Sequence, residues 1–149
     1  MRAVVQRVRD ASVSLEGRLV DTIASGLLVY LGVGRDDTDK DLSIICDKIV
    51  NLRIFSDVNG KMNLSVTDVR GEIMMVSQFT LFGDAREGRR PSYTEAAAPD
   101  LARRMYEKAI ERIRLSGLHV ATGEFQAAME VAYTNLGPVT ILLDSEKRF

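Results

Sequence analysis

The sequence predicts a single α+β domain over residues 1–149, with a bent or barrel-like, mostly antiparallel sheet and two main helices. Three observations lead to this expectation. The length of 149 residues suits one ordinary domain. Apolar residues make up 46% of the chain, enough for a full core that needs no disulfide or metal. Most of them alternate with polar residues or run continuously over short stretches, as in strands, and only two stretches have helical spacing.

Strands are expected where apolar side chains alternate or run continuously between turn residues. In chain order these are residues 1–9, 11–15, 18–23, 26–33, 52–55, 72–82, 118–121, 124–134 and 138–143. Glu16-Gly17 marks a hairpin turn between the second and the third. The runs 26–33 and 72–82 are apolar on both faces, which is typical of buried strands. One face of the stretch 124–134 carries Phe125, Ala127, Met129, Val131 and Tyr133.

Two helices are expected to pack on this sheet. Asp36 to Asp39 offer several N-cap candidates for the first, whose apolar stripe is Leu42, Ile45, Cys46, Ile49 and Val50. The second begins near Pro99-Asp100, and Gly117 is a natural C-terminal stop. Its packing residues are Leu101, Met105, Tyr106, Ala109, Ile110 and Ile113.

Composition and charge exclude several classes of protein. Twenty basic and 21 acidic residues give a formal net charge of −1, which excludes a strongly cationic nucleic-acid coat but not a local basic patch. One cysteine and one histidine cannot build a zinc site of the usual kind, so we expect no metal and no cofactor. The lone cysteine suits a reducing compartment, and the charged start resembles neither a signal peptide nor a membrane span. We therefore expect a soluble cytoplasmic protein with no membrane partner.

Other familiar chemistries fit the sequence poorly. A Ser-His-Asp triad would need His119, which lies in an expected strand, where a lone histidine is more often structural. Cys46 lies on the apolar stripe of a helix, where a buried thiol is usually inert. Gly32-Val33-Gly34 between a strand and a helix is partly like a dinucleotide-binding loop, but Asp37 replaces the third glycine.

Polar residues interrupt an otherwise apolar strand at Ser77-Gln78-Phe79-Thr80. Buried hydroxyls and amides cost about 1–3 kcal/mol each unless they are paired. Either these side chains form a satisfied structural network, or the end of the strand opens into a pocket. Phe79 suits a pocket wall in the second case and the core in the first.

A Gly-Pro step stands between two expected strands, in the segment Asn135-Leu136-Gly137-Pro138-Val139-Thr140. Neither residue suits a strand interior, and the bond before a proline is the kind that can be cis. The segment is therefore either a simple β-turn or a rigid corner that aims two backbone carbonyls. Arg7 interrupts an apolar face, and it either braces this corner through a carbonyl or lies on the surface of an edge strand.

The motifs Ser-Gln-Phe-Thr and Asn-x-Gly-Pro-Val-Thr, in this order, resemble the two signature motifs of the D-aminoacyl-tRNA deacylases, also called D-tyrosyl-tRNA deacylases. The similarity runs from end to end and includes residues 2–8, 51–55, 60–66 and 88–93. Two small departures are Glu87, where a basic residue is expected, and Leu136 in the variable slot. The resemblance implies a homodimer that hydrolyses the ester between a D-amino acid and the 3′-terminal adenosine of tRNA. It also implies that Gly137-Pro138 is cis and reaches into the partner subunit's pocket.

The resemblance also assigns roles to individual residues. The catalytic ones are Ser77, Gln78, Phe79 and Thr80, and those for substrate binding and chiral selection are Gly137, Pro138, Asn135, Arg7 and Met129. The carbonyls of the corner would bind the α-amino group and leave no room for a side chain of L configuration. Glycine, including glycine mischarged on tRNA-Ala, is expected to pass such a filter because it has no side chain.

Two hydrolytic mechanisms remain open at this stage. Thr80 as a covalent nucleophile would need a base, and no histidine or obvious carboxylate accompanies the motif. Alternatively, backbone N–H groups around residues 78–80 form an oxyanion hole, and the neighbouring ribose 2′-hydroxyl activates water. We favour the second mechanism.

Contacts to RNA phosphates are expected from Arg86, Arg89 and Arg90, in the loop after the first motif, and from Lys61 in another loop. No RNA-reading module with stacked aromatic residues is visible, so recognition is expected at the acceptor end. Two rival functions remain. One is a non-catalytic module that binds an RNA end or an amine, and the other is an unselective esterase that uses Thr80 or Ser77.

Overall fold

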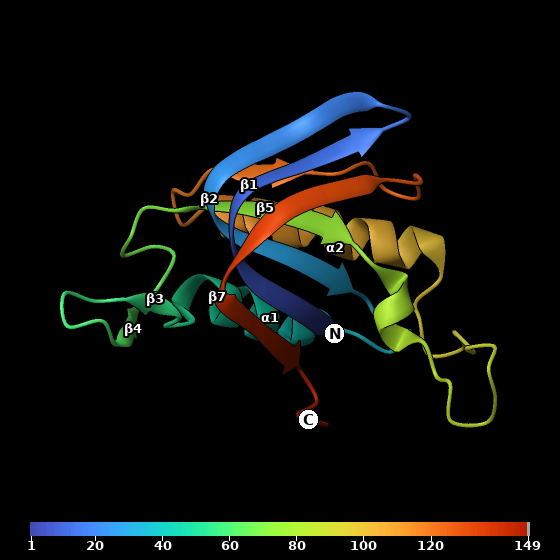
Figure 1. Ribbon diagram of the computed structural model, residues 1–149. Coiled ribbons are helices and arrows are strands. Elements are labelled where there is room, and N and C mark those ends of the chain that lie inside the picture. The colour runs from blue at the N-terminus through green and yellow to red at the C-terminus, as the bar shows by residue number, and fades with distance from the viewer. Residues whose placement is uncertain (149) are drawn as a thin grey trace.

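The computed structural model describes residues 1–148. The protein consists of a five-stranded sheet against which two helices pack (Figure 1). The strands lie in the order β6-β5-β2-β1-β7, and a separate two-stranded hairpin, β3–β4, projects from one side. In chain order the elements are β1 (Arg2–Leu15), β2 (Arg18–Gly32), α1 (Asp39–Asn51), β3 (Phe55–Ser56), β4 (Met62–Leu64), β5 (Glu72–Ser77), the 3₁₀ turn η1 (Phe79–Phe82), α2 (Pro99–Arg114), β6 (Val120–Thr122) and β7 (Glu130–Asp144).

The two long ladders of the sheet are antiparallel, because β1 pairs with β2 on one side and with β7 on the other. The two short ladders, β2–β5 and β5–β6, are parallel. The α+β class and the bent, mostly antiparallel sheet expected from the sequence are therefore confirmed. Within residues 1–148 the sheet stays open, with β6 and β7 as its edges.

Several expected strands merge into longer ones. Residues 1–9 and 11–15 form one strand, β1, which passes through Asp10 with a positive φ of 52°. In the same way, β2 passes through Gly26, where a Cβ atom would lie 1.8 Å from the carbonyl oxygen of Glu72. A glycine at this position is what allows β5 to pair so closely with β2.

Two expectations about strands are wrong. The run 72–82 leaves the sheet after Ser77 and continues as η1, although apolar residues resume at Leu81 and Phe82 as they would in a longer strand. Residues 124–129 belong to no strand and turn at 125–127, and β7 begins only at Glu130. Burial alternates through this turn segment as it would in a strand, which is why the pattern misled. The short strands also shift, from 52–55 to 55–56 and from 118–121 to 120–122.

The helices begin where the sequence predicts. The carboxylate of Asp41 accepts a hydrogen bond from the backbone N–H of Thr38, the N-cap of α1, at 2.9 Å. Pro99 occupies the first turn of α2, where its missing N–H costs nothing. Ion pairs join the exposed sides of the two helices, Lys108 with Asp39 at 2.9 Å and Arg112 with Asp47 at 3.1 Å.

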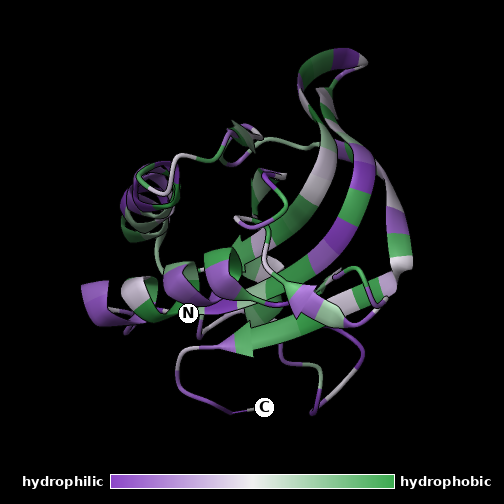
Figure 2. Cartoon of the chain, turned by 90° about the vertical axis from the view of Figure 1, so that its left-hand side faces the viewer, coloured by the Kyte–Doolittle hydropathy of each residue, from purple (hydrophilic) through white to green (hydrophobic). Residues whose placement is uncertain are grey.

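Apolar side chains form two clusters, one on each face of the sheet. The larger packs α1 and α2 against alternate residues of β1, β2 and β5. The smaller lies on the opposite face, around Leu28, Met74 and Val76, with Met129 and Val131 packed against it. Figure 2 shows the matching alternation of hydropathy along the strands. Neither helix in residues 1–148 is both long and apolar enough to cross a membrane.

Candidate active site

A cavity of about 690 Å³ opens where β5 ends, a size typical of small-molecule sites. One of its walls is the first turn of α2 together with the segment that precedes it, and another is the turn segment that leads into β7. All of its lining residues are uncharged, and they include Ser77, Gln78, Phe79, Tyr93, Ala102, Phe125 and Met129. Of the two alternatives that the sequence left open for this strand end, the structure shows the pocket.

The first motif lies at the point where the chain leaves β5. The backbone N–H of Gln78 donates to the carbonyl of Leu31 at 2.8 Å, which ends the pairing with β2. Phe79 is 56% exposed and makes an edge-to-face contact with Tyr93, with ring centroids 5.1 Å apart. Phe79 is thus a pocket wall and not a core residue. Sequence reasoning missed Tyr93, because its loop has no periodicity that could reveal a wall.

The backbone donors of the motif are not equivalent. The N–H of Gln78 is already hydrogen-bonded to the carbonyl of Leu31. The expectation that it contributes to an oxyanion hole is therefore wrong. Within residues 1–148, the N–H groups of Phe79 and Thr80 have no acceptor, as is usual for the first residues of a helical turn. Two neighbouring donors beside an uncharged cavity are suited to stabilising a negative oxygen.

Thr80 is exposed and is not among the residues that line the cavity. Its hydroxyl oxygen accepts a hydrogen bond from the side-chain amide of Gln78. An amide donor holds the hydroxyl in place but cannot remove its proton. Within the described chain, no histidine, lysine or carboxylate is hydrogen-bonded to Thr80, so nothing there activates it as a nucleophile.

Two glycines at and just after the end of β2, Gly32 and Gly34, leave space for the turn η1. A Cβ atom on Gly32 would lie 2.9 Å from the carbonyl oxygen of Gln78. One on Gly34 would lie 3.0 Å from the ring of Phe82. The pair of glycines that is partly like a dinucleotide-binding loop therefore serves packing. Sequence reasoning noted both residues but missed their role.

Arg2, which sequence reasoning did not single out, holds the far end of the turn. Its guanidinium donates to the carbonyl of Leu81 at 3.0 Å and lies over the ring of Phe82, 4.6 Å from the centroid. It also pairs with Asp144, at the end of β7, at 3.2 Å. Arg2 thereby ties the turn after β5 to the last strand of the sheet.

The second motif is a bulged corner inside β7. Gln6 pairs with Thr140 and Val8 with Asn135, so four residues of β7 stand opposite the single residue Arg7. The Gly137-Pro138 bond is cis, in agreement with the expectation. The amide of Asn135 spans the corner, since it accepts from Val139 N–H at 3.2 Å and donates to the Thr140 hydroxyl at 3.1 Å. The alternative of a simple β-turn between two strands is wrong, because β7 is continuous.

Arg7 braces this corner. Its guanidinium donates to the carbonyls of Leu136, at 3.3 Å, and Ile54, at 2.6 Å. A Cβ atom on Gly137 would lie 2.8 Å from the Nη2 atom of Arg7. The absence of a side chain at this position therefore allows the close contact between the corner and the guanidinium. The reading of Arg7 as a surface residue of an edge strand is wrong, because β1 has a neighbour on both sides.

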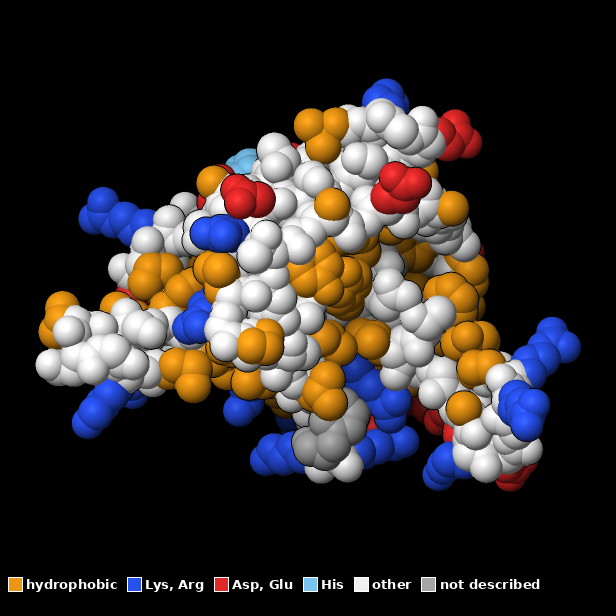
Figure 3. Space-filling view, in the orientation of Figure 1, with side chains coloured by type: hydrophobic (Ala, Val, Ile, Leu, Met, Phe, Trp, Pro, Cys, Tyr) orange, Lys and Arg blue, Asp and Glu red, His pale blue; other side chains and the backbone are white. Residues whose placement is uncertain are grey.

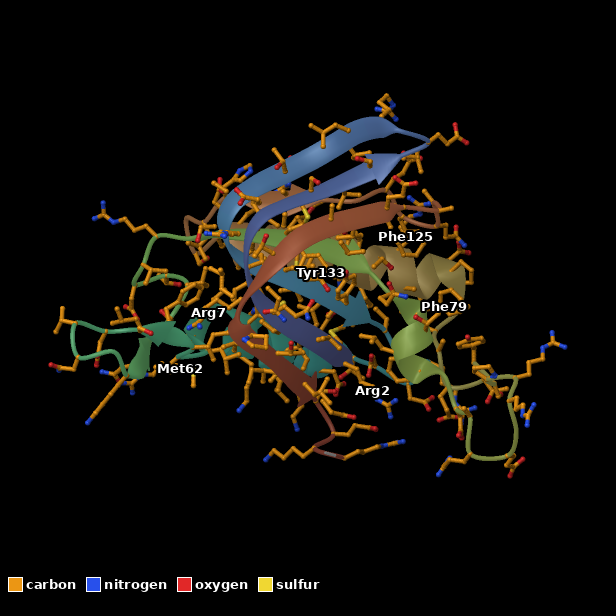
Figure 4. The ribbon with its side chains drawn as sticks, viewed as in Figure 1. Arg2, Arg7, Met62, Phe79, Phe125 and Tyr133 are labelled. Carbon is orange, nitrogen blue, oxygen red and sulfur yellow. The ribbon has the colours of Figure 1, made fainter. Side chains whose placement is uncertain are left out.

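The two motifs do not meet within one chain. Neither Gly137 nor Pro138 lines the cavity, and both are exposed. In Figure 4, Arg7 lies at the bend of β7, well away from Phe79 and Phe125. Of the residues assigned to chiral selection, Met129 alone lines the cavity of its own chain. A Cβ atom on Gly123 would lie 2.5 Å from the sulfur of Met129, so that glycine makes space for the side chain.

The four basic residues expected to bind RNA do not form one patch. Arg86, Arg89 and Arg90 lie in a loop closed by two backbone hydrogen bonds of 2.8 Å between Asp84 and Ser92. Arg86 pairs with Asp84 at 2.5 Å, and this partner holds the pKa of the Asp84 carboxyl at about 2. Lys61 lies in the β3–β4 hairpin, on the opposite side of the molecule in Figure 1.

A family model described as D-Tyr-tRNA(Tyr) deacylase matches residues 4–144 of this chain. The chain belongs to this family. The deacylase resemblance inferred from the two motifs is therefore confirmed. Among curated relatives, the D-aminoacyl-tRNA deacylase of Thermosipho africanus is 56% identical and that of Desulfitobacterium hafniense is 58% identical. Each alignment covers all of both chains.

Solved structures share the fold of this deacylase family member. A protein named c-Myc DNA Unwinding Element Binding Protein is 40% identical and superposes with a TM-score of 0.91, over 97% of this chain and 98% of that chain. A probable eukaryotic D-amino acid tRNA deacylase superposes with a TM-score of 0.85, over 96% of this chain and 98% of that one. At 17% identity, the second shows a common fold alone.

We predict that Gly32→Ala lowers the deacylation rate of D-tyrosyl-tRNA by on the order of 10²-fold, because the added Cβ displaces the carbonyl of Gln78 and with it the neighbouring N–H groups. The rate is measured by release of labelled amino acid at a temperature where circular dichroism shows the variant folded. Gly88→Ala is the matched control, since nothing lies within 4 Å of a Cβ there. A wild-type rate for Gly32→Ala would show that the turn does not depend on this glycine.

Proposed function

We propose that this chain hydrolyses the ester bond of D-aminoacyl-tRNA and releases the free D-amino acid and the tRNA. The observation that carries the proposal is the pair of N–H groups of Phe79 and Thr80, which find no acceptor among the described residues and lie beside an uncharged cavity. Membership of the deacylase family and the names of the curated relatives supply the substrate class. The reaction is ester hydrolysis by water and needs no cofactor.

The N–H groups of Phe79 and Thr80 act on the tetrahedral intermediate. When water adds to the ester carbonyl, the carbonyl oxygen becomes negative and accepts from both donors. Each well-placed donor of this kind contributes about 3–4 kcal/mol to transition-state stabilisation. The uncharged lining of the cavity strengthens these hydrogen bonds, because it lowers the local dielectric constant. Ser77 and Gln78 shape the wall, and the amide of Gln78 fixes Thr80.

The substrate itself supplies the group that activates water. Within residues 1–148 the hydroxyl of Thr80 is hydrogen-bonded only to the amide of Gln78, which donates to it and cannot take its proton, so a covalent threonyl intermediate is disfavoured. The 2′-hydroxyl of the terminal ribose is adjacent to the ester and orients the attacking water. The oxygen of water then bonds to the carbonyl carbon, and the bond from this carbon to the ribose 3′-oxygen breaks. One proton of the attacking water passes through the 2′-hydroxyl to the 3′-oxygen, which leaves as the ribose hydroxyl, and the amino acid is released with a free carboxyl group.

Chiral selection is assigned to the Gly137-Pro138 corner, which Arg7 and Asn135 hold in place. Its exposed carbonyls bind the α-amino group of the substrate, and the backbone fills the space that an L side chain would need. A 10⁴-fold preference requires about 5.5 kcal/mol, which a fixed corner supplies through steric clash. Glycyl esters pass this filter, including glycine mischarged on tRNA-Ala. Met129 lines the cavity in which the adenosine end is bound.

A homodimer brings the corner to the cavity. Within one chain the corner lies outside the cavity, whereas a two-fold pairing gives each cavity the partner subunit's corner. The edge strand β7 supports this pairing, because no other strand of residues 1–148 pairs with its outer side and it exposes Tyr133 and Leu142, the latter by 57%. Figure 3 shows hydrophobic side chains gathered over the middle of this face. Exposed apolar groups of this kind mark interaction surfaces.

RNA phosphates are bound by the loop that follows the first motif. Arg89 and Arg90 are exposed there, while Arg86 stiffens the loop through its pair with Asp84. Lys61 provides a separate contact from the β3–β4 hairpin. Because the substrate is charged tRNA, we place the protein in the cytoplasm, where translation consumes it.

Two alternatives are tested by the same assay. The first is a module that binds nucleic acid or an amine without turnover, a possibility raised by the DNA-binding name of one solved relative. The second is an unselective esterase that uses Thr80 or Ser77. A binding module releases no amino acid, and an unselective esterase cleaves D and L esters alike.

We predict that the protein releases D-tyrosine from D-tyrosyl-tRNA and glycine from glycyl-tRNA, and leaves L-tyrosyl-tRNA intact. The reason is that the corner excludes only an L side chain. Release of labelled amino acid from the three substrates measures this. Cleavage of all three would indicate an unselective esterase, and cleavage of none a binding protein.

A second prediction concerns the ribose. D-tyrosyl-tRNA that ends in 2′-deoxyadenosine should be cleaved on the order of 10²-fold more slowly, because the group that orients water is missing. Thr80→Val should retain much of the wild-type rate on the normal substrate. Normal cleavage of the deoxy substrate, together with an inactive Thr80→Val variant that remains folded, would instead assign the chemistry to Thr80.

A third prediction tests whether the Gly137-Pro138 corner serves the cavity of its own chain or that of the partner subunit. Gly137→Ala damages the corner and Gly32→Ala damages the cavity, so each homodimer should be nearly inactive. A heterodimer of the two variants, purified through two different tags, should regain about half of the wild-type activity because one of its two sites is intact. If the corner serves the cavity of its own chain, the heterodimer has no intact site and stays inactive.

A further inference from the structure

Arg103 holds a fixed position beside the cavity. It follows Ala102, which lines the cavity on the first turns of α2. Its guanidinium lies over the ring of Phe125, 4.7 Å from the centroid, and Phe125 lines the cavity from the opposite segment. Such a cation–π contact restricts the side chain without using its N–H donors.

Within the described part of the chain, the charge of Arg103 is uncompensated. The ion pairs that α2 makes are those of Lys108 and Arg112, and within residues 1–148 Arg103 has no carboxylate partner. The side chain is exposed, so its donors are accessible to a ligand. Arg86, in the loop expected to bind RNA, is in contrast already paired with Asp84. Arg103 therefore differs from Arg86: it contacts a cavity wall, and its N–H donors are accessible to a ligand.

The cavity cannot itself hold a phosphate. All of its lining residues are uncharged, and an isolated phosphodiester would lose its hydration there without gaining a cation. A nucleotide whose ribose ester lies at Phe79 and Thr80 must leave its nearest phosphate outside the cavity mouth. An arginine at the rim is the group that binds such an anion, through two parallel hydrogen bonds.

We infer that Arg103 binds the phosphodiester on the 5′ side of the terminal adenosine and thereby sets how the RNA end enters the cavity. This inference rests on the proposed function, since it names the anchor for the same substrate. Arg103 is a positioning residue: it contacts the substrate's backbone and takes no part in bond breaking. Phe125 orients Arg103 through the ring contact, and it also lines the cavity.

Arg103→Gln should raise KM for D-tyrosyl-tRNA about tenfold and leave kcat unchanged, because one charge-assisted contact is lost and the reacting groups are untouched. Arg104→Gln is the matched control, since it removes the same charge from the next residue of α2, for which no aromatic contact is formed within residues 1–148. It should behave as wild type. Two small substrates sharpen the test, the 3′-O-D-tyrosyl esters of adenosine and of adenosine 5′-monophosphate.

The variant should cleave the ester of adenosine as the wild type does, but should lose the advantage that the wild type gains from the 5′-phosphate. Equal losses on both small substrates would assign Arg103 to the cavity wall and overturn the inference. Equal KM values of the variant and the wild type for tRNA would overturn it as well.

Binding of uncharged RNA ending in CCA distinguishes failure of this inference from failure of the proposed function, since it needs no hydrolysis. Arg103→Gln should weaken binding about tenfold and reduce the slope of log affinity against log salt by about one, a change that a structural defect would not produce. An unchanged slope and affinity would contradict the inference even if the protein hydrolyses no ester. Loss of turnover in the wild type, with this slope change intact, would count against the proposed function alone.

Discussion

The chemistry at the end of β5 depends on how closely the chain packs against the end of β2. Gly32 and Gly34 have no side chains, and the carbonyl of Gln78 and the ring of Phe82 occupy the space that side chains would fill. This approach allows Leu31 to accept the N–H of Gln78, which removes that donor from the site. The next two N–H groups, of Phe79 and Thr80, begin the helical turn and have no acceptor within residues 1–148. A packing constraint on one side of the turn therefore decides which donors are available on the other.

The Gly-Pro corner depends on a different set of contacts, most of which hold backbone groups. Arg7 binds two carbonyls that belong to segments far apart in the sequence, at Ile54 and Leu136. Asn135 and Thr140 hydrogen-bond to each other across the four-residue bulge. An arginine is suited to the first task because its donors form a rigid fork that stays charged when half-buried. The spacing of the motif thus reflects the geometry of the bulge.

Most of the architecture follows from local patterns that the sequence displays directly. The apolar stripes of the helices and the alternation in β1 gave the correct class, and the polar interruption at Ser77 to Thr80 gave the correct place for a cavity. The end of β5 was not predictable, since Leu81 and Phe82 are apolar because they pack under β2 and not because they extend the strand. The segment 124–129 imitates a strand because exposed and half-buried residues alternate along it.

Other features depend on contacts between residues distant in the sequence, which no local pattern records. The bond from Arg2 to Leu81, the wall formed by Tyr93 and the stacking of Arg103 on Phe125 all join separate elements. The same holds for the register of β1 against β7, which alone reveals that four residues form a bulge. Sequence motifs identified the residues of the corner, but their arrangement became clear only from this pairing.

β1 links the two motifs in a way that restricts changes in chain length. Arg2 holds the turn after β5 and Arg7 holds the corner, five positions apart along one strand. An odd spacing places the two side chains on opposite faces of the sheet, where their respective partners lie. Inserting or deleting one residue between them would move one arginine to the wrong face and release either the turn or the corner. The distance between the motifs is thus set by the number of residues in a strand that contributes no atom to the chemistry, and family members should tolerate substitutions there far better than changes in length.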